Sequence, residues 1–169
     1  MFSLRKSLEL AHKTLTQANV DHALIGGLAL ATLGVNRATA DVDFLIDGGD
    51  RERAQASLLG AGYTLTTQSP EVLHFDGVGK LDLLLANRPL SKTMLASAQV
   101  FPQHGIKCLS AEDIIGLKIQ AYKNNPQREL QDKADIQALI MGRTGLDWAK
   151  IKTYADIFDE WTVVEALKK

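Results

Sequence analysis

The sequence has a single cysteine, Cys108, and this scarcity excludes any disulfide within the chain. It also argues against cysteine-based metal sites and fits a reducing compartment. A formal net charge of -1 provides no global field that would attract nucleic acid or an anionic membrane. No segment approaches the about 20 apolar residues of a membrane-spanning helix, and the amphipathic N-terminal stretch lacks the apolar core of a signal peptide. We therefore expect a soluble, cytoplasmic protein without a membrane partner.

What the chain does contain is enough apolar surface for a hydrophobic core. Its 169 residues are 46% hydrophobic and 23% charged, which is ordinary for a globular protein. That length suits one domain, or one domain with a small helical appendage.

The residue pattern divides into a mixed region and a helical region. Strands are expected at 20–25, 41–46, 63–67, 72–75 and 80–85, with weaker signals near 100 and at 106–108. Helices are expected at 3–18, 27–33, 51–59, 91–98, 110–123 and 128–141, with one or two further helices over 148–166. The turn at 76–79 predicts a hairpin between the two runs that flank it. We therefore predict an α/β (α+β) core over residues 1–109 and a C-terminal helical segment, residues 110–169, packed on that core.

The segment "TADVDFLID" places two aspartates, Asp41 and Asp43, in a strand that is otherwise apolar. Side chains two residues apart in a strand share one face and are about 6.5–7 Å apart along the chain. Like charges held this close cost free energy unless a cation lies between them, and carboxylate oxygens suit Mg²⁺ or Mn²⁺. The alternative is that both aspartates are solvated at the start of the strand.

Upstream, Gly26 and Gly27 lie between a predicted strand and a short predicted helix. Glycines at such a turn let the backbone approach a phosphate, and the free N–H groups of a helix start favour an anion. An ordinary tight turn explains the two glycines equally well. The turn and the aspartate pair together are more specific than either alone, because a metal and phosphates would then be neighbours.

A third acid, Asp82, lies within the apolar run "KLDLLLA". An acid in such a strand is expensive to bury unless it is paired or bound to a metal. Asp76, by contrast, has an ordinary role in the turn "DGVG". The histidines show no metal-ligand spacing, and we expect His74 to be incidental.

These residues together resemble the motif of the nucleotidyltransferase superfamily typified by DNA polymerase beta. The motif consists here of Gly26, Gly27, Arg37, Thr39, Asp41, Asp43 and Asp82. The pattern most resembles a small bacterial branch that includes nucleotidyltransferase-type toxins of abortive-infection systems and aminoglycoside nucleotidyltransferases. The resemblance covers roughly residues 20–140, and the polar positions of that branch's helical segment are matched by Lys118, Arg128, Asp132 and Asp135.

The resemblance implies a mixed-sheet nucleotidyltransferase core that transfers a nucleoside monophosphate from an NTP, such as ATP, to a hydroxyl. It assigns Asp41, Asp43 and Asp82 to binding Mg²⁺ or Mn²⁺, with Asp82 also orienting or deprotonating the attacking hydroxyl. The residues that it assigns to the nucleotide are Gly26, Gly27, Arg37, Thr39 and Lys118.

Several of these positions also have a plain structural explanation. Arg37 fits a solvated surface arginine, Thr39 a hydroxyl that orders its loop, and Lys118 a lysine whose stem packs on apolar neighbours. Ordinary helix salt bridges explain Asp132 and Asp135 as well as a function does.

The acceptor and the activity itself stay open. The acceptor implied by the resemblance is tRNA or another RNA, a protein, or a small molecule, and a toxin of a toxin–antitoxin system would have an antitoxin protein as partner. The family usually has Gly-Ser at the turn, whereas this chain has Gly26-Gly27 and so lacks a hydroxyl that could bond a phosphate. The alternative function is therefore a catalytically inactive relative that binds a nucleotide or a partner protein. A third possibility is a simple α/β binding protein whose aspartate pair lies on the surface and has no function.

Overall fold

The computed structural model describes residues 3–169 and divides the chain into two compact units. The first unit runs to Ala29 and continues from Ala38 to Leu109, and the second comprises Leu30–Arg37 and Ser110–Lys169. The boundary after Leu109 coincides with the change of character in the sequence, but the short segment Leu30–Arg37 groups with the helices. Among residues 3–169, no helix has both the length and the apolar character needed to cross a bilayer.

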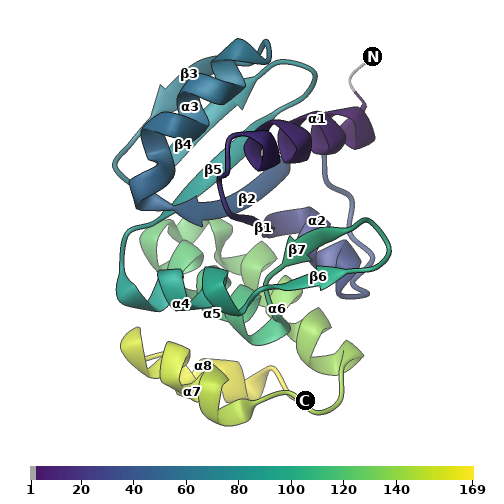
Figure 1. Cartoon of the computed structure of the whole chain (residues 1–169). Coiled ribbons are helices and arrows are strands. Elements are labelled where there is room, and N and C mark those ends of the chain that lie inside the picture. Colours follow the sequence, from purple (N-terminus) through teal and green to yellow (C-terminus); the bar gives the residue numbers. More distant parts are fainter. Residues whose placement is uncertain (1–2) are drawn as a thin grey trace. The chain divides into compact units, whose positions relative to one another are not determined.

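A seven-stranded mixed sheet forms the first unit (Figure 1). Its order across the sheet is β3-β4-β5-β2-β1-β7-β6. The pairs β2–β5 and β1–β7 are parallel, and the other neighbours are antiparallel. The strands are β1 (His22–Leu24), β2 (Val42–Asp47), β3 (Thr64–Gln68), β4 (Val72–Asp76), β5 (Leu81–Ala86), β6 (Gln99–Phe101) and β7 (Ile106–Cys108). The expected mixed sheet and the hairpin of β4 and β5 are confirmed.

Helices accompany this sheet. They are α1 (Leu4–Gln17), α2 (Gly26–Thr32), α3 (Arg51–Gly60), which follows the short 3-10 turn Gly48–Asp50, and α4 (Pro89–Ser97). Helix α1 packs against α3 and β2, whereas α4 packs against β2 and β5. Helix α2 starts in the first unit and ends in the second.

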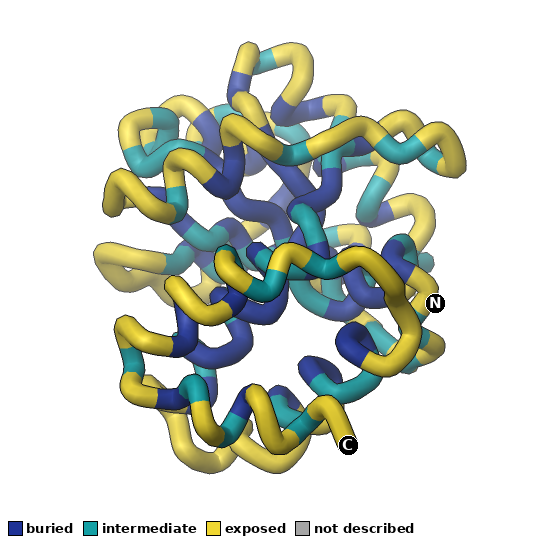
Figure 2. The backbone as a smooth tube through the Cα atoms, turned by 90° about the horizontal axis from the view of Figure 1, so that it is seen from below, coloured by how far each residue is buried: buried dark blue, intermediate teal, exposed yellow. Residues whose placement is uncertain are grey.

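The neighbouring strands β2 and β5 each have a face of buried apolar side chains, and each carries an acid at its second position on the opposite face. The apolar side chains that flank the two acids in sequence, Val42, Phe44, Leu81 and Leu83, are fully buried. Asp43 and Asp82, which lie between them in sequence, are only half-buried. Because alternate residues of a strand point to opposite faces, both acids project away from this part of the core. Figure 2 colours the backbone by burial, with buried stretches in dark blue and exposed stretches in yellow.

The second unit is helical apart from its short leading segment. Its elements are α5 (Ala111–Asn124), the 3-10 turn Pro126–Arg128, α6 (Glu129–Gly142), α7 (Trp148–Ile157) and α8 (Trp161–Ala166). Helix α5 packs against α6 and α7, and α7 packs against α8. The Ser110 hydroxyl accepts a hydrogen bond from the Asp113 amide at 3.2 Å, so Ser110 caps the start of α5.

A close contact joins α5 to α7. A Cβ on Gly116 would lie 2.6 Å from the ring of Tyr154, so only glycine lets the ring pack here. The Tyr154 hydroxyl donates a hydrogen bond to the buried carboxylate of Asp113. Burial and this hydrogen bond raise the pKa of Tyr154 above its usual range, so the hydroxyl remains a donor at neutral pH.

Candidate active site

Three polar side chains form one row across the neighbouring strands β4, β5 and β2. His74 is the register partner of Asp82, and Asp82 is the register partner of Asp43. Register partners share a face of the sheet, and adjacent strands lie about 4.8 Å apart. Two of the three predicted acids are therefore close neighbours.

The imidazole of His74 is bonded directly to one of these acids. Its Nδ1 lies 2.7 Å from Oδ1 of Asp82, and because an ionised carboxylate can only accept, Nδ1 carries the proton. We expected His74 to be incidental, and the structure instead places it on a predicted catalytic residue. The predicted hairpin contained the signal, since a pairing across the turn that sets Phe75 opposite Leu81 also sets His74 opposite Asp82.

The first glycine of the predicted phosphate turn lies against the carboxylate of Asp43. Gly26 has a φ of +63°, which favours glycine. An added Cβ would lie 2.3 Å from Oδ2 of Asp43, so the missing side chain makes room for this carboxylate. The neighbouring amide of Ile25 donates to the Asp43 carbonyl at 3.0 Å. The turn and the acid are thus adjacent, as the motif predicted.

The second glycine faces Thr39. A Cβ on Gly27 would lie 2.5 Å from Cβ and 2.6 Å from Oγ1 of Thr39, distances that no real side chain tolerates. The Thr39 hydroxyl donates to the Asp41 carbonyl at 3.3 Å, which suits the loop-ordering role considered from the sequence. The departure from Gly-Ser therefore has a steric reason, because Thr39 fills the space where a serine side chain would begin.

A cleft of about 350 Å³ lies beside the row. Its lining includes Asp41, His74, Asp82, Thr66, Thr67 and Lys80. The third predicted acid, Asp41, precedes β2 and is half-buried in this cleft. The cleft therefore gives an external molecule access to Asp82 and Asp41 together.

The donor chemistry of the row suits a divalent cation. Carboxylate oxygens are the ligands that Mg²⁺ prefers, and the space left by Gly26 accommodates the Asp43 carboxylate beside Asp82. Within residues 3–169, however, no three histidine, cysteine, aspartate or glutamate side chains are already grouped as a metal site. The acids fit Mg²⁺ or Mn²⁺ by type and by register, and the three-acid cluster is not preassembled.

The two predicted nucleotide-binding cations, Arg37 and Lys118, lie together in the helical unit. The Lys118 Nζ is 2.9 Å from Asp132 and 2.7 Å from Asp135, and Arg37 Nη1 is 2.6 Å from Asp135. Lys118, Asp132 and Asp135 are all buried, and Arg128 adds a further pair with Asp132 at 3.2 Å. Both cations therefore belong to a buried ion cluster, which favours the structural explanation for the helix acids.

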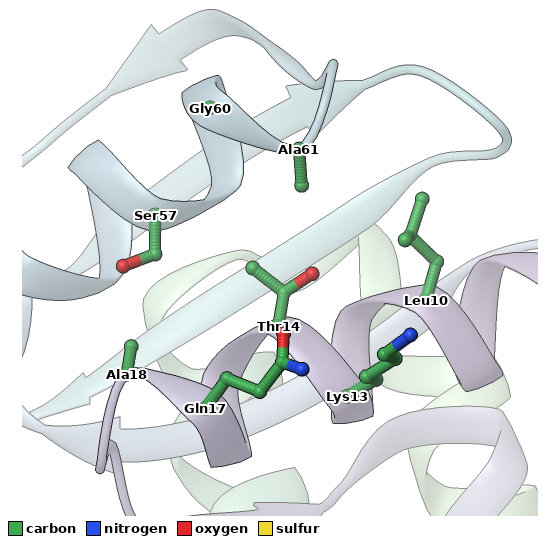
Figure 3. Close-up of a pocket in the computed structure, with 8 residues that line it drawn as sticks. All are labelled: Leu10, Lys13, Thr14, Gln17, Ala18, Ser57, Gly60 and Ala61. Carbon is green, nitrogen blue, oxygen red and sulfur yellow. The ribbon is translucent and has the colours of Figure 1, made fainter.

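A shallow groove of about 440 Å³ lies elsewhere in the first unit, between α1 and α3 (Figure 3). Small and polar side chains line it, and Lys13 is the charged group among those that Figure 3 labels. It contains none of the residues predicted to act on a nucleotide.

Comparison with known proteins supports the fold. No protein-family model and no curated protein matches the sequence. The structure is similar to the solution structure of the antibiotic-resistance factor ANT(2'')-Ia, with 18% identity, 98% of this chain and 97% of that chain covered, and a TM-score of 0.70. It is also similar to the lincosamide antibiotic adenylyltransferase LnuA in its lincomycin-bound form, with 17% identity, coverage of 82% and 98%, and a TM-score of 0.60. A nucleotidyltransferase-like protein from Paracoccidioides brasiliensis gives 21% identity, coverage of 95% and 88%, and a TM-score of 0.58. The predicted fold is therefore confirmed: the chain has the nucleotidyltransferase fold.

Proposed function

We propose that this protein is a metal-dependent nucleotidyltransferase that moves a nucleoside monophosphate from an NTP to a hydroxyl acceptor. One observation carries the proposal. Asp43 and Asp82 are register partners on one face of the sheet, and the Asp43 carboxylate lies against Gly26 of the turn. In a nucleotidyltransferase fold, two acids suited to a cation next to a turn suited to phosphates support this activity.

Each residue then has a stated task. Asp41, Asp43 and Asp82 would hold Mg²⁺ or Mn²⁺, which when bound offsets phosphate charge and lowers the pKa of a coordinated hydroxyl. The backbone of the Gly26-Gly27 turn binds the phosphates, and Thr39 keeps its loop in place through the Asp41 carbonyl.

Asp82 takes the proton from the acceptor hydroxyl. The hydroxyl oxygen forms a bond to the α-phosphorus, the bond from that phosphorus to the β-phosphate bridging oxygen breaks, and pyrophosphate leaves. The cleft beside Asp82 supports this role, because it admits an acceptor to the carboxylate.

The roles of Arg37 and Lys118 toward the nucleotide stay predictions. Their pairing with Asp132 and Asp135 favours a structural role in the helical unit. Contact with a triphosphate would require these cations to leave, or to share, their carboxylate partners.

A small-molecule acceptor is the one that we favour. The similar structures include ANT(2'')-Ia in complex with adenylyl-2''-tobramycin and LnuA with bound lincomycin. RNA and protein acceptors stay alternatives. A toxin role with an antitoxin partner rests on the sequence resemblance alone and stays a prediction.

The experiment that tests the proposal combines binding with transfer. Each α-labelled NTP is incubated with Mg²⁺ and either a panel of hydroxyl-bearing small molecules or a total cell extract, and the labelled product is identified. Nucleotide binding is followed by calorimetry and thermal unfolding. At about 100 times Kd, Mg²⁺–NTP should raise the free energy of unfolding by about 2.7 kcal/mol.

Variants separate the tasks. Asp43→Asn should abolish the ligand-dependent gain in stability, whereas Asp76→Asn, at the exposed end of β4 on the wall of the same cleft, should retain it. Asp82→Ala should retain much of the NTP affinity and lose transfer by at least about a hundredfold, the low end for removing a general base.

If the wild type binds Mg²⁺–NTP and labels no acceptor, the inactive nucleotide-binding alternative holds. If it binds no nucleotide, the likeness extends to the fold alone.

A further inference from the structure

His74 occupies a fixed place in the row of polar side chains. Its neighbours in β4, Leu73 and Phe75, are buried and pair with Leu83 and Leu81 of β5. These apolar pairs fix the register of the hairpin, and with it the position of the His74 backbone opposite Asp82. The contact between the imidazole and the carboxylate is therefore built into the sheet and does not depend on a mobile loop.

The hydrogen bond restricts the Asp82 carboxylate. Nδ1–H of His74 engages Oδ1 at 2.7 Å, which fixes the rotation of the carboxyl group and occupies one of its two oxygens. Asp43 lies on the opposite side of Asp82 in the same row. The second oxygen, Oδ2, is thereby left for the ligands of the site.

Stability does not explain this pair. The His74 and Asp82 side chains are 44% and 32% exposed, and pairs with this exposure contribute little to folding. Both side chains line the cleft. A half-exposed hydrogen bond that orients a predicted catalytic carboxylate is more useful in the reaction than in the fold.

We propose that His74 is a positioning residue of the transfer reaction, holding the Asp82 carboxylate by Nδ1–H so that Oδ2 meets the acceptor hydroxyl. The inference rests on the proposed function. It adds a residue that acts through Asp82, and His74 itself needs no contact with the substrate.

Two substitutions at position 74 test the hydrogen bond itself. His74→Leu removes the donor, whereas the amide of His74→Asn can place an N–H group close to the position of Nδ1. H74L should lower kcat by about 10–100-fold, the usual cost of removing a partner that orients a ligand or a catalytic group, with the Kd for Mg²⁺–NTP nearly unchanged. H74N should recover most of that loss. Equal losses in both variants, or a loss confined to KM, would contradict the positioning role.

A double-mutant cycle separates positioning from a general effect on the cleft. In the Asp82→Asn background no carboxylate remains to be oriented, so H74L should cause little further loss of kcat. A full additional loss there would mean that His74 acts independently of Asp82, and the inference would fall.

A third measurement needs no activity. The long-range proton–nitrogen spectrum of the imidazole reports which ring nitrogen carries the proton. His74 should be in the Nδ1–H form in the wild type and should lose this preference in Asp82→Ala, whereas the same preference in both proteins would overturn the inference.

The two proposals also fail differently. A wild type that transfers nothing refutes both, and a wild type that transfers as fast as H74L refutes only the positioning role of His74.

Discussion

The protein contains two clusters of carboxylates that look alike in sequence and differ in their surroundings. Asp132 and Asp135 of the helical unit are 1% and 3% exposed, and Lys118, Arg37 and Arg128 neutralise them. Asp43 and Asp82 of the sheet are half-buried and adjacent across two strands, and the ion-pair partner of Asp82 is the half-exposed His74.

This difference separates carboxylates that support the fold from carboxylates that can serve a ligand. Burying a charge is costly, so an acid in the interior must be paired within the protein. An acid at the wall of an open cleft keeps part of its hydration and can take its counter-charge from outside. On this ground we propose that the first cluster serves stability and that the second serves the transfer reaction.

The largest expected effect concerns the buried cluster. Lys118→Met preserves much of the side-chain volume and leaves Asp132 and Asp135 without their central cation. We expect the free energy of unfolding to fall by about 3 kcal/mol, the low end for breaking a buried pair, because Arg37 and Arg128 remain. Denaturant unfolding followed by circular dichroism measures the change.

The matched control is Lys152→Met, which breaks the pair with Asp156 on the surface of α7, where the two side chains are 48% and 52% exposed. That variant should unfold like the wild type. If K118M kept full stability but lost affinity for Mg²⁺–NTP, the assignment of the buried cluster to stability would be wrong. Lys118 would then be the nucleotide contact that the motif predicts.

Local patterns were enough to predict the elements of the site. Runs of apolar residues located β2 and β5, the turn "DGVG" located the hairpin of β4 and β5, and the glycine pair located the start of α2. Each of these features depends on residues close together in the chain. The nucleotidyltransferase fold itself was implied by the resemblance of the motif to that superfamily.

Contacts between distant segments could not be read in the same way. The parallel pairing of β2 with β5 makes Asp43 a partner of Asp82, and no local pattern specifies that register. The burial of these acids could not be predicted from sequence either. Both "DVD" and "DKAD" look like polar positions on a regular element, and only the tertiary packing encloses Asp132 and Asp135. The crowding of Gly27 by Thr39 likewise exists only once the loop has folded back.

A moderate effect is expected at the glycine turn. Gly27→Ser would introduce the residue usual in the family, but its Cβ would collide with Thr39. We expect a loss of about 1–3 kcal/mol in the free energy of unfolding, as for other overpacked sites. In the background Thr39→Gly the collision disappears, so the added cost of G27S should fall to a small fraction of this value.

Gly60→Ser is the control for this substitution, because an added Cβ meets nothing within 4 Å at that position. It should leave stability nearly unchanged. If G27S were tolerated without a change at Thr39, the steric explanation for the missing serine would be wrong. The departure from Gly-Ser would then again favour an inactive relative.

The smallest expected effect tests whether buried polar groups in the sheet unit also serve stability. His22 is 6% exposed, and its Nδ1 donates to the Val20 carbonyl at 2.7 Å. Neutral His22 therefore accepts at Nε2, where Nδ1 of His12 donates at 2.7 Å. Because its pKa is lowered, His22 is neutral at neutral pH, and both of its ring nitrogens are hydrogen-bonded within the protein, as the helix acids are.

The pH dependence of stability follows from this arrangement. Burial lowers the pKa of His22 and is only partly offset by the bond to Val20, and burial also lowers the pKa values of His12 and His104. Below the unfolded pKa of about 6.5, the unfolded chain binds more protons than the folded chain. The free energy of unfolding therefore falls as the pH decreases, by at most about 1.4 kcal/mol per pH unit for each proton.

Thermal unfolding between about pH 7.5 and 5.5 measures this slope above the pH range in which carboxylates titrate. His12→Asn, which retains a donor for His22 and removes one titrating ring, should match the wild type at the upper limit and show a shallower decline. A wild-type stability that stays flat or rises on acidification would mean that the histidine pair is not held neutral by the fold.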